Sequence, residues 1–268
     1  MINNEKYLYL INYLKKLEKV ILAFSGGVDS TFLLKVAKQA LGDNIKAVTI
    51  QSPYIPKWEI AEAKQLVTQL GVAFEILETP IIAEIRNNPE NRCYLCKQAV
   101  FSQIKAIARR EGYPHVIDGT NFDDTGDYRP GLKALRELNI KSPLLECQLG
   151  KQEIRSLSKE LGLSTWDKPP YACLLTRIPY GNELKEEDFV KIEKAETYMM
   201  NSGFRAVRVR CHDNLARIEV DQKDINKLFN EMLLAEIAGK FKEFGFKYVT
   251  LDLQGYRVGS FNETRETK

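Results

Sequence analysis

Two glycines within the segment Ala23 to Thr31, which reads AFSGGVDST, are the most informative residues of this chain for chemistry. After an apolar run, a glycine pair lets the backbone turn tightly and come close to an anion. A helix that starts there offers free N–H groups and the positive end of its dipole, both of which favour phosphate. The segment lacks the closing Lys-Ser/Thr of a Walker loop and does not read GxGxxG. It therefore predicts a different kind of phosphate loop, with an ordinary strand–turn–helix corner as the alternative.

A second polar cluster, from Asp118 to Asp124, reads DGTNFDD and also follows an apolar run. Ligands of parallel sheets gather beyond the carboxyl ends of the strands. A glycine and several carboxylates at such a position suit a tight turn beside a nucleotide and its metal ion. A hydrophilic loop of turn-forming residues would look similar. Because the glycine loop is expected at the same sheet edge, we favour nucleotide binding.

Short apolar runs alternate with amphipathic segments over the first 166 residues, a pattern typical of a parallel sheet with helices on both faces. After the three prolines of the following irregular stretch, the pattern changes to a small α+β arrangement with a hairpin. We therefore expect an α/β domain over 1–166, a linking loop over 167–182 and an α+β domain over 183–268. The expected strands are 20–24, 46–51, 72–77, 115–118, 205–211, 216–220 and 247–253, and the expected helices are 30–41, 58–70, 96–111, 152–161, 186–201 and those within 224–244.

The N-terminal segment is expected to form an amphipathic helix with Leu8, Ile11, Leu14 and Leu17 on one face. It mixes charges through its apolar positions and does not read as a signal peptide. At the other end, residues past Glu263 are expected to be disordered.

Composition is that of an ordinary globular protein, since 268 residues with 44% hydrophobic side chains suffice for a full core and a smaller domain. A formal net charge of +3 does not mark a nucleic-acid binder. No aliphatic run approaches the roughly 20 residues that a membrane span needs. Five cysteines without an export signal suggest a reducing, cytoplasmic compartment, where thiols serve metal binding or chemistry.

The motif SGGVDS at Ser25 to Ser30 resembles the phosphate loop of the PP-loop ATPases. That resemblance implies cleavage of ATP between its α- and β-phosphates and adenylation of a carboxylate or carbonyl oxygen. The loop would hold the leaving pyrophosphate, Asp29 would help to place Mg²⁺, and the adenine would lie along the first two strands. The implied ATP-binding residues are Ala23, Phe24, Ser25, Gly26, Gly27, Asp29, Ser30, Gln51, Ser52, Gly119 and Asp123.

Later segments narrow the resemblance to the LarE family, which makes the sulfur-bearing nickel-pincer nucleotide cofactor. Members adenylate a carboxylate of pyridinium-3,5-dicarboxylic acid mononucleotide, release pyrophosphate and replace oxygen with sulfur to give the thiocarboxylate. The resemblance therefore implies an ATP-dependent sulfurtransferase, with Cys173, Asp29 and Arg177 as catalytic residues and sulfide or another sulfur donor as a partner. The matching stretches, within about Lys19 to Val220, are Gly126 to Gly131, Ser142 to Leu144, Lys151 to Leu161 and Trp166 to Gly181.

LarE proteins occur in two forms that differ in the origin of the sulfur. In one, a cysteine matching Cys173 gives up its own sulfur; in the other, three cysteines hold a 4Fe-4S cluster that carries an extra sulfide. Here Cys93 and Cys96 accompany Cys173, and three thiolates would leave one iron open to sulfide. A helix start with flanking Arg92 and Lys97 is expected to lower the thiol pKa values. We therefore favour the cluster form.

Other interpretations of the cysteines stay open. Cys173 alone would suffice for sacrificial donation, and a redox pair at Cys93 and Cys96 would leave Cys173 without a use. A closed zinc site needs four ligands, for which only His115 and His212 are spare. The remaining thiols, Cys147 and Cys211, are expected to pack as small hydrophobic side chains.

Arginines alternate with apolar residues from Arg205 to Arg210, which places Arg208 and Arg210 on one strand face. Guanidinium groups suit a nucleotide phosphate, so these two, with Arg217 on the next strand and Arg177 of the cysteine loop, are candidate substrate ligands. The alternative is the solvated polar face of a hairpin. By resemblance, Glu196 and Glu219 match acidic positions near an inter-subunit metal site, and LarE relatives suggest a homohexamer.

Three other functions are weighed against this one. A tRNA thiolase would use a similar cysteine trio but needs a broad basic surface. A non-catalytic nucleotide-binding module would hold ATP and use the cysteines for zinc. An ammonia-using synthetase would need a separate ammonia supply, because the chain has no amidotransferase domain, and would leave the cysteines without a role.

Overall fold

The computed structural model describes residues 2, 4–126 and 130–257. The chain divides into two compact units, Met1–Ile85 with Asn91–Tyr171, and Arg86–Glu90 with Ala172–Lys268. Residues 127–129 of the LarE-like stretch and the tail past Glu263 lie outside the described residues. A search of the described helices finds none with the length and apolar character to cross a membrane.

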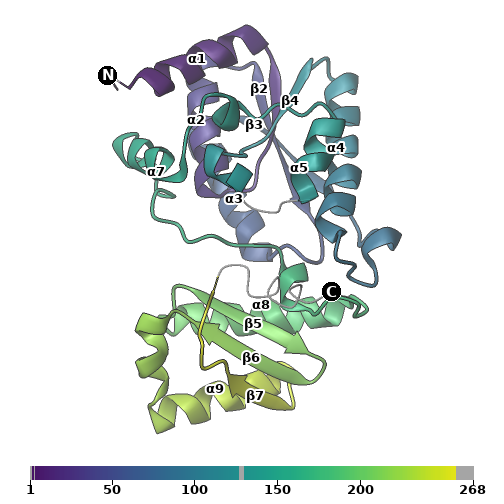
Figure 1. Cartoon of the computed structure of the whole chain (residues 1–268), viewed down its shortest axis with the longest axis vertical. Helices are drawn as coiled ribbons and strands as arrows, with labels where there is room; N and C mark the ends of the chain where they lie inside the picture. The colour runs from purple at the N-terminus through teal and green to yellow at the C-terminus, as the bar shows by residue number, and fades with distance from the viewer. Residues whose placement is uncertain (1, 3, 127–129, 258–268) are drawn as a thin grey trace. The chain divides into compact units, whose positions relative to one another are not determined.

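A four-stranded parallel sheet forms the centre of the first unit (Figure 1). β1 (Val20–Ala23) lies between β2 (Ile45–Gln51) and β4 (His115–Ile117), and β3 (Ala73–Glu78) pairs with β2. Because successive strand residues face opposite sides of a sheet, Leu22 joins one core cluster and Ile21 the other. The predicted α/β class is confirmed.

Helices cover both faces of this sheet. The cluster around Leu22 draws on α1 (Glu5–Leu17), α2 (Val28–Leu41), α3 (Lys57–Leu70), α6 (Pro143–Glu146) and α7 (Lys151–Glu160). The cluster around Ile21 draws on α4 (Arg92–Arg110) and α5 (Pro130–Glu137), which lie side by side in Figure 1. Two short 3₁₀ turns complete the unit, η1 (Ala83–Ile85) and η2 (Phe122–Gly126).

The expected buried face of the N-terminal helix is wrong at one position. Tyr7, Leu10, Leu14 and Leu17 are buried, whereas Leu8 is 46% exposed. Residues at a constant spacing of three rotate by about 60° per step around an α-helix, so Leu8 and Leu17 lie on opposite sides. The true face alternates spacings of three and four, which keeps the side chains in one stripe.

The second unit contains a three-stranded sheet in the order β5 (Val207–His212), β6 (Leu215–Val220), β7 (Tyr248–Leu251). β5 and β6 form the predicted antiparallel hairpin, and β7 pairs in parallel with β6. The described elements around the sheet are η3 (Leu174–Arg177), α8 (Glu186–Asn201), η4 (Gln222–Leu228) and α9 (Glu231–Glu243). Residues 172–182 of the expected linker belong to this unit.

Candidate active site

The phosphate loop joins β1 to α2 and is anchored to β2. The Phe24 N–H donates to the Val48 carbonyl at 2.9 Å, and Thr49 Oγ1 donates to the Phe24 carbonyl at 2.8 Å. Gly26 has φ +69°, a left-handed conformation that favours glycine, and an added Cβ would meet Ala63 Cβ at 3.3 Å. No described side chain caps the first turn of α2, whose cap residue is Gly27. The start of α2 therefore has backbone donors that could bind an anion, and phosphate binding at this loop stays a prediction.

Acidic residues from both predicted clusters meet at a lysine that the sequence analysis did not single out. Lys151 Nζ lies 2.5 Å from Asp29 Oδ2, and its backbone N–H donates to Asp123 Oδ2 at 2.7 Å. Asp29 Oδ1 is buried, and no described residue hydrogen-bonds it. A carboxylate oxygen without a described protein partner suits Mg²⁺, which prefers oxygen ligands, and Asp123 offers a second carboxylate at the backbone of the same lysine. The arrangement can therefore hold a metal–triphosphate beside an ammonium group.

Gly119 links the second cluster to the phosphate loop. A Cβ at Gly119 would meet Ser30 N at 3.1 Å, a tight contact, so glycine eases the close approach of these two backbones. The preceding Asp118 is buried and accepts hydrogen bonds from the hydroxyls of Thr120 and Ser142. Burial raises the pKa of the Asp118 carboxyl. Asp118 therefore stabilises the turn that brings Gly119 against the start of α2.

The residues predicted for adenine lie at the end of β2. Gln51 is exposed and its amide donates to Glu78 at 3.4 Å. Ser52 is buried, and no described residue hydrogen-bonds its Oγ. A buried hydroxyl without a hydrogen-bond partner in the protein is a candidate for a ligand contact, because leaving a buried polar group unsatisfied costs free energy.

α4 begins at Arg92, four residues before the start predicted at residue 96, so Cys93 and Cys96 lie in its first two turns. Cys93 is exposed and Cys96 is half-buried, with its Sγ 3.3 Å from Tyr54 Oη. Burial raises the pKa of the Cys96 thiol, with a further rise from Cys93 that the Tyr54 hydrogen bond opposes. Desolvation thus outweighs the expected lowering of the Cys96 pKa by the helix start and Lys97.

Cys173 directly precedes η3 in the second unit, so the three cysteines are divided between the two units. Its carbonyl accepts hydrogen bonds from Thr176, and Arg177 Nη1 donates to the Ala172 carbonyl at 3.0 Å. Among the residues that the structure describes, no three His, Cys, Asp or Glu side chains are grouped so as to hold a metal ion. The hydrogen bond from Arg177 to the Ala172 carbonyl orders the turn that carries Cys173.

The arginines predicted for the substrate phosphate form a buried network. Arg177 contacts Glu196 through two hydrogen bonds at 2.8 and 3.0 Å, and Arg210 contacts Glu219 at 2.8 and 2.7 Å. Burial lowers the pKa of Arg208, which lies over the Tyr256 ring. Both faces of β5 are buried, so the alternative of a solvated polar face is wrong. α8 and η3, which pack on β5, supply the groups that cover it.

Arg217 is the most exposed of the four arginines proposed for the substrate phosphate. Its side chain is 34% exposed and lies 3.1 Å from Glu219 and 3.5 Å from Asp252. Arg210 Nη1 also donates to the Thr176 carbonyl at 2.6 Å. The network therefore holds the backbone around the cysteine turn, with one guanidinium at its accessible edge.

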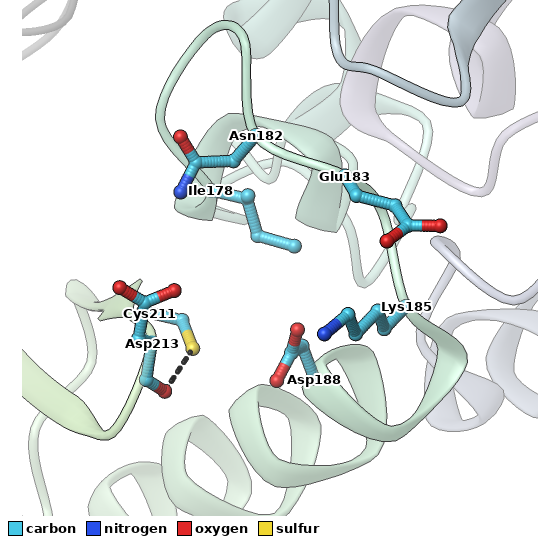
Figure 2. A pocket seen from close by; sticks show the side chains of 7 residues that line it. All are labelled: Ile178, Asn182, Glu183, Lys185, Asp188, Cys211 and Asp213. Carbon is cyan, nitrogen blue, oxygen red and sulfur yellow. Dashed lines mark hydrogen bonds between the residues drawn. The ribbon is translucent and has the colours of Figure 1, made fainter.

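A cavity of about 160 Å³ in the second unit contains one of the two remaining cysteines (Figure 2). Cys211 Sγ donates to the Asp213 carbonyl at 3.4 Å, and burial raises the pKa of this thiol to about 12. Cys147, in the first unit, is equally buried, and its pKa is also raised to about 12. Both thiols are neutral and packed, as expected. The residues around the cavity are Ile178, Asn182, Glu183, Lys185, Asp188, Cys211 and Asp213.

Comparison with known proteins agrees with this geometry. A family model described as NAD synthase matches residues 2–109. An uncharacterized protein of Synechocystis sp. is 42% identical over 94% of this chain and 95% of its own length. One of Methanocaldococcus jannaschii is 38% identical over 96% and 99%. The pyridinium-3,5-bisthiocarboxylic acid mononucleotide synthase of Lactiplantibacillus plantarum is 37% identical over 95% and 93%. This chain therefore belongs to the LarE family of PP-loop proteins, to which that synthase belongs.

Proposed function

We propose that this chain is an ATP-dependent sulfurtransferase that converts a carboxylate of pyridinium-3,5-dicarboxylic acid mononucleotide into a thiocarboxylate for nickel-pincer cofactor synthesis. The observation that carries the proposal is the phosphate loop with its left-handed Gly26, in a chain that matches the Lactiplantibacillus plantarum synthase over 95% of its length. A carboxylate is a poor electrophile, so the reaction needs ATP to turn an oxygen into a leaving group. We place the reaction in the cytoplasm.

Adenylation comes first. A substrate carboxylate oxygen attacks the α-phosphorus of ATP, the bond to the β-phosphate oxygen breaks, and pyrophosphate leaves. Backbone N–H groups at the start of α2 hold the leaving group. Asp29 and Asp123 would hold Mg²⁺, which neutralises phosphate charge, and Lys151 adds positive charge at the same place. A sulfide sulfur then attacks the carbonyl carbon, and AMP departs with the original oxygen.

Cys93, Cys96 and Cys173 would hold a 4Fe-4S cluster. Thiolates are the ligands that such a cluster takes; Cys93 and Cys96 lie three residues apart in α4, and Cys173 of the second unit would supply the third sulfur. When bound, such a cluster supplies an iron without a protein ligand, at which exogenous sulfide can reside. The protein chain would then survive turnover, in contrast to a chain that donates the sulfur of Cys173.

Arg208, Arg210 and Arg217, with Arg177 beside them, would provide the positive field for the nucleotide phosphate. Arg217 is the member that solvent reaches, so it is the one we expect to touch the phosphate. For Glu196 and Glu219 we propose a metal site between subunits of a homohexamer, where the metal would compete with Arg177 and Arg210 for these carboxylates. Light scattering with and without a chelator tests the assembly.

The test is a reaction under anaerobic conditions with ATP, the mononucleotide and sulfide. We expect substrate-dependent pyrophosphate release and a product in which sulfur replaces oxygen by mass. Iron and acid-labile sulfide, about four of each per chain and lost in Cys93→Ala, support the cluster form. Loss of H₂S from Cys173 during turnover instead identifies sacrificial donation. Pyrophosphate release that needs RNA rather than the mononucleotide would overturn the proposal.

A further inference from the structure

Lys168 is a buried lysine that the reaction described above does not use. Its side chain is only 11% exposed, although lysine is rarely buried unless it is paired. Its Nζ donates to Glu62 Oε2 of α3 at 2.6 Å and to the backbone carbonyl of Gly26 at 3.0 Å. One ammonium group thus joins a helix, the segment after α7 and the phosphate loop.

The surroundings fix the position of this ammonium. Trp58 and Tyr171 meet edge to face with ring centroids 5.0 Å apart, and Lys168 Nζ lies 5.9 and 5.7 Å from the two centroids. Aromatic rings at this distance attract a cation. Arg155 Nη2 donates to the Lys168 backbone carbonyl at 2.8 Å, which also holds the main chain. The lysine is therefore placed by contacts on its side chain and its backbone.

Its contact with Gly26 determines how the next peptide group points. A trans peptide is planar, with its C=O and N–H on opposite sides, and the described chain has no cis peptide. When Lys168 holds the Gly26 carbonyl, the Gly27 N–H must point the other way, toward Ser25 Oγ at 3.4 Å inside the loop. If that peptide flipped, a carbonyl oxygen would face the anion and repel it.

We propose that Lys168 is a positioning residue for the phosphate loop. It holds the Gly26–Gly27 peptide in the orientation that gives an N–H to the pyrophosphate part of ATP, and Glu62 anchors it there. This inference deepens the proposed function, because it takes that part of ATP as the ligand of the loop. It also gives a role to the WDKP segment, Trp166 to Pro169, for which the sequence pattern predicted none. The lysine of this segment lies five residues before Cys173.

Binding of magnesium pyrophosphate, with adenosine as the reference ligand, tests the proposal by calorimetry. Lys168→Met is expected to weaken pyrophosphate binding about tenfold or more and to leave adenosine binding unchanged, because adenosine does not use the loop. Lys168→Arg keeps the charge but changes its geometry, and should restore part of the affinity. Lys64→Met, at an exposed lysine of the same helix as Glu62, is the matched control and should bind both ligands normally.

Glu62→Gln separates positioning from direct contact with phosphate. Without its anchor the lysine no longer holds the Gly26 carbonyl, so pyrophosphate binding should weaken. If Lys168 instead touched phosphate directly, releasing it from Glu62 would leave binding unchanged or tighten it, which would overturn the proposal, as would normal pyrophosphate binding by folded Lys168→Met. Neither measurement requires sulfur transfer. If the proposed reaction fails while these variants weaken pyrophosphate binding as expected, the role of Lys168 stands.

Discussion

The ion pairs at the two candidate sites, one in each unit, differ in how far solvent reaches them. In the first unit, the Lys151–Asp29 pair has side chains 35% and 20% exposed. In the second, the Arg177–Glu196 pair is 1% and 8% exposed, and the Arg210–Glu219 pair is 6% and 1% exposed. An accessible pair can exchange partners with an incoming ligand, whereas a buried pair is part of the architecture. The comparison separates the accessible charges, which we propose act on ATP, from the buried charges that hold the cysteine turn.

The largest expected effect comes from breaking a buried pair. Glu196→Gln should lower the free energy of unfolding by about 3–5 kcal/mol, because it strands the Arg177 guanidinium in the interior. Chemical denaturation measures the loss. The control is Glu243→Gln, which removes an exposed partner of Lys240 and should cost less than about 1 kcal/mol. Equal stability of the two variants would contradict the contrast between buried and exposed pairs.

Lys151→Met should give the opposite balance, a catalytic loss without a large stability loss. We expect the kcat of pyrophosphate release to fall by roughly 10²-fold, because a cation near the developing phosphate charge is removed. The free energy of unfolding should change by less than about 1 kcal/mol. The control is Lys6→Met, which breaks an exposed ion pair between Lys6 of α1 and Glu153, a residue of the same helix as Lys151. It should change neither the kcat nor the free energy of unfolding. A variant that unfolds more readily yet releases pyrophosphate normally would reverse our assignment.

The same contrast explains what the sequence could predict. The phosphate loop binds through local backbone, so two glycines and the helix after them were enough to locate it. Lys151 and Lys168 reach Asp29 and Gly26 from 122 and 142 residues away, a proximity that only the folded chain creates. The period of β5 assigned Arg208 and Arg210 to one face correctly. It carried no information about α8 and η3, which cover that strand and bury its arginines.

Gly26→Ala should show how much of the loop depends on one backbone conformation. At φ +69° an alanine costs about 1–2 kcal/mol, and its Cβ would also press on Ala63. Pyrophosphate affinity should fall along with stability, as measured by denaturation and calorimetry. Gly27→Ala is the matched control, since Gly27 has φ −79° and the nearest atom to an added Cβ is Ser25 Oγ at 3.4 Å. Equal stability losses in both variants would show that the left-handed conformation is not the cause.

The smallest effect at neutral pH concerns the buried thiols, one in each unit. Cys147 and Cys211 have pKa values raised from 9.0 to about 12, so the folded protein keeps their protons when the unfolded chain has lost them. Stability from this source is therefore complete below about pH 9 and falls between pH 9 and 12 as the unfolded thiols ionise. Cys147→Ala and Cys211→Ala should each make the alkaline loss of unfolding free energy less steep.

The exposure of the thiols also predicts their order of labelling near neutral pH. Mass spectrometry after iodoacetamide treatment should find exposed Cys93 labelled first and both buried thiols last. Rapid labelling of Cys147 or Cys211 would show that its side chain is accessible to the reagent.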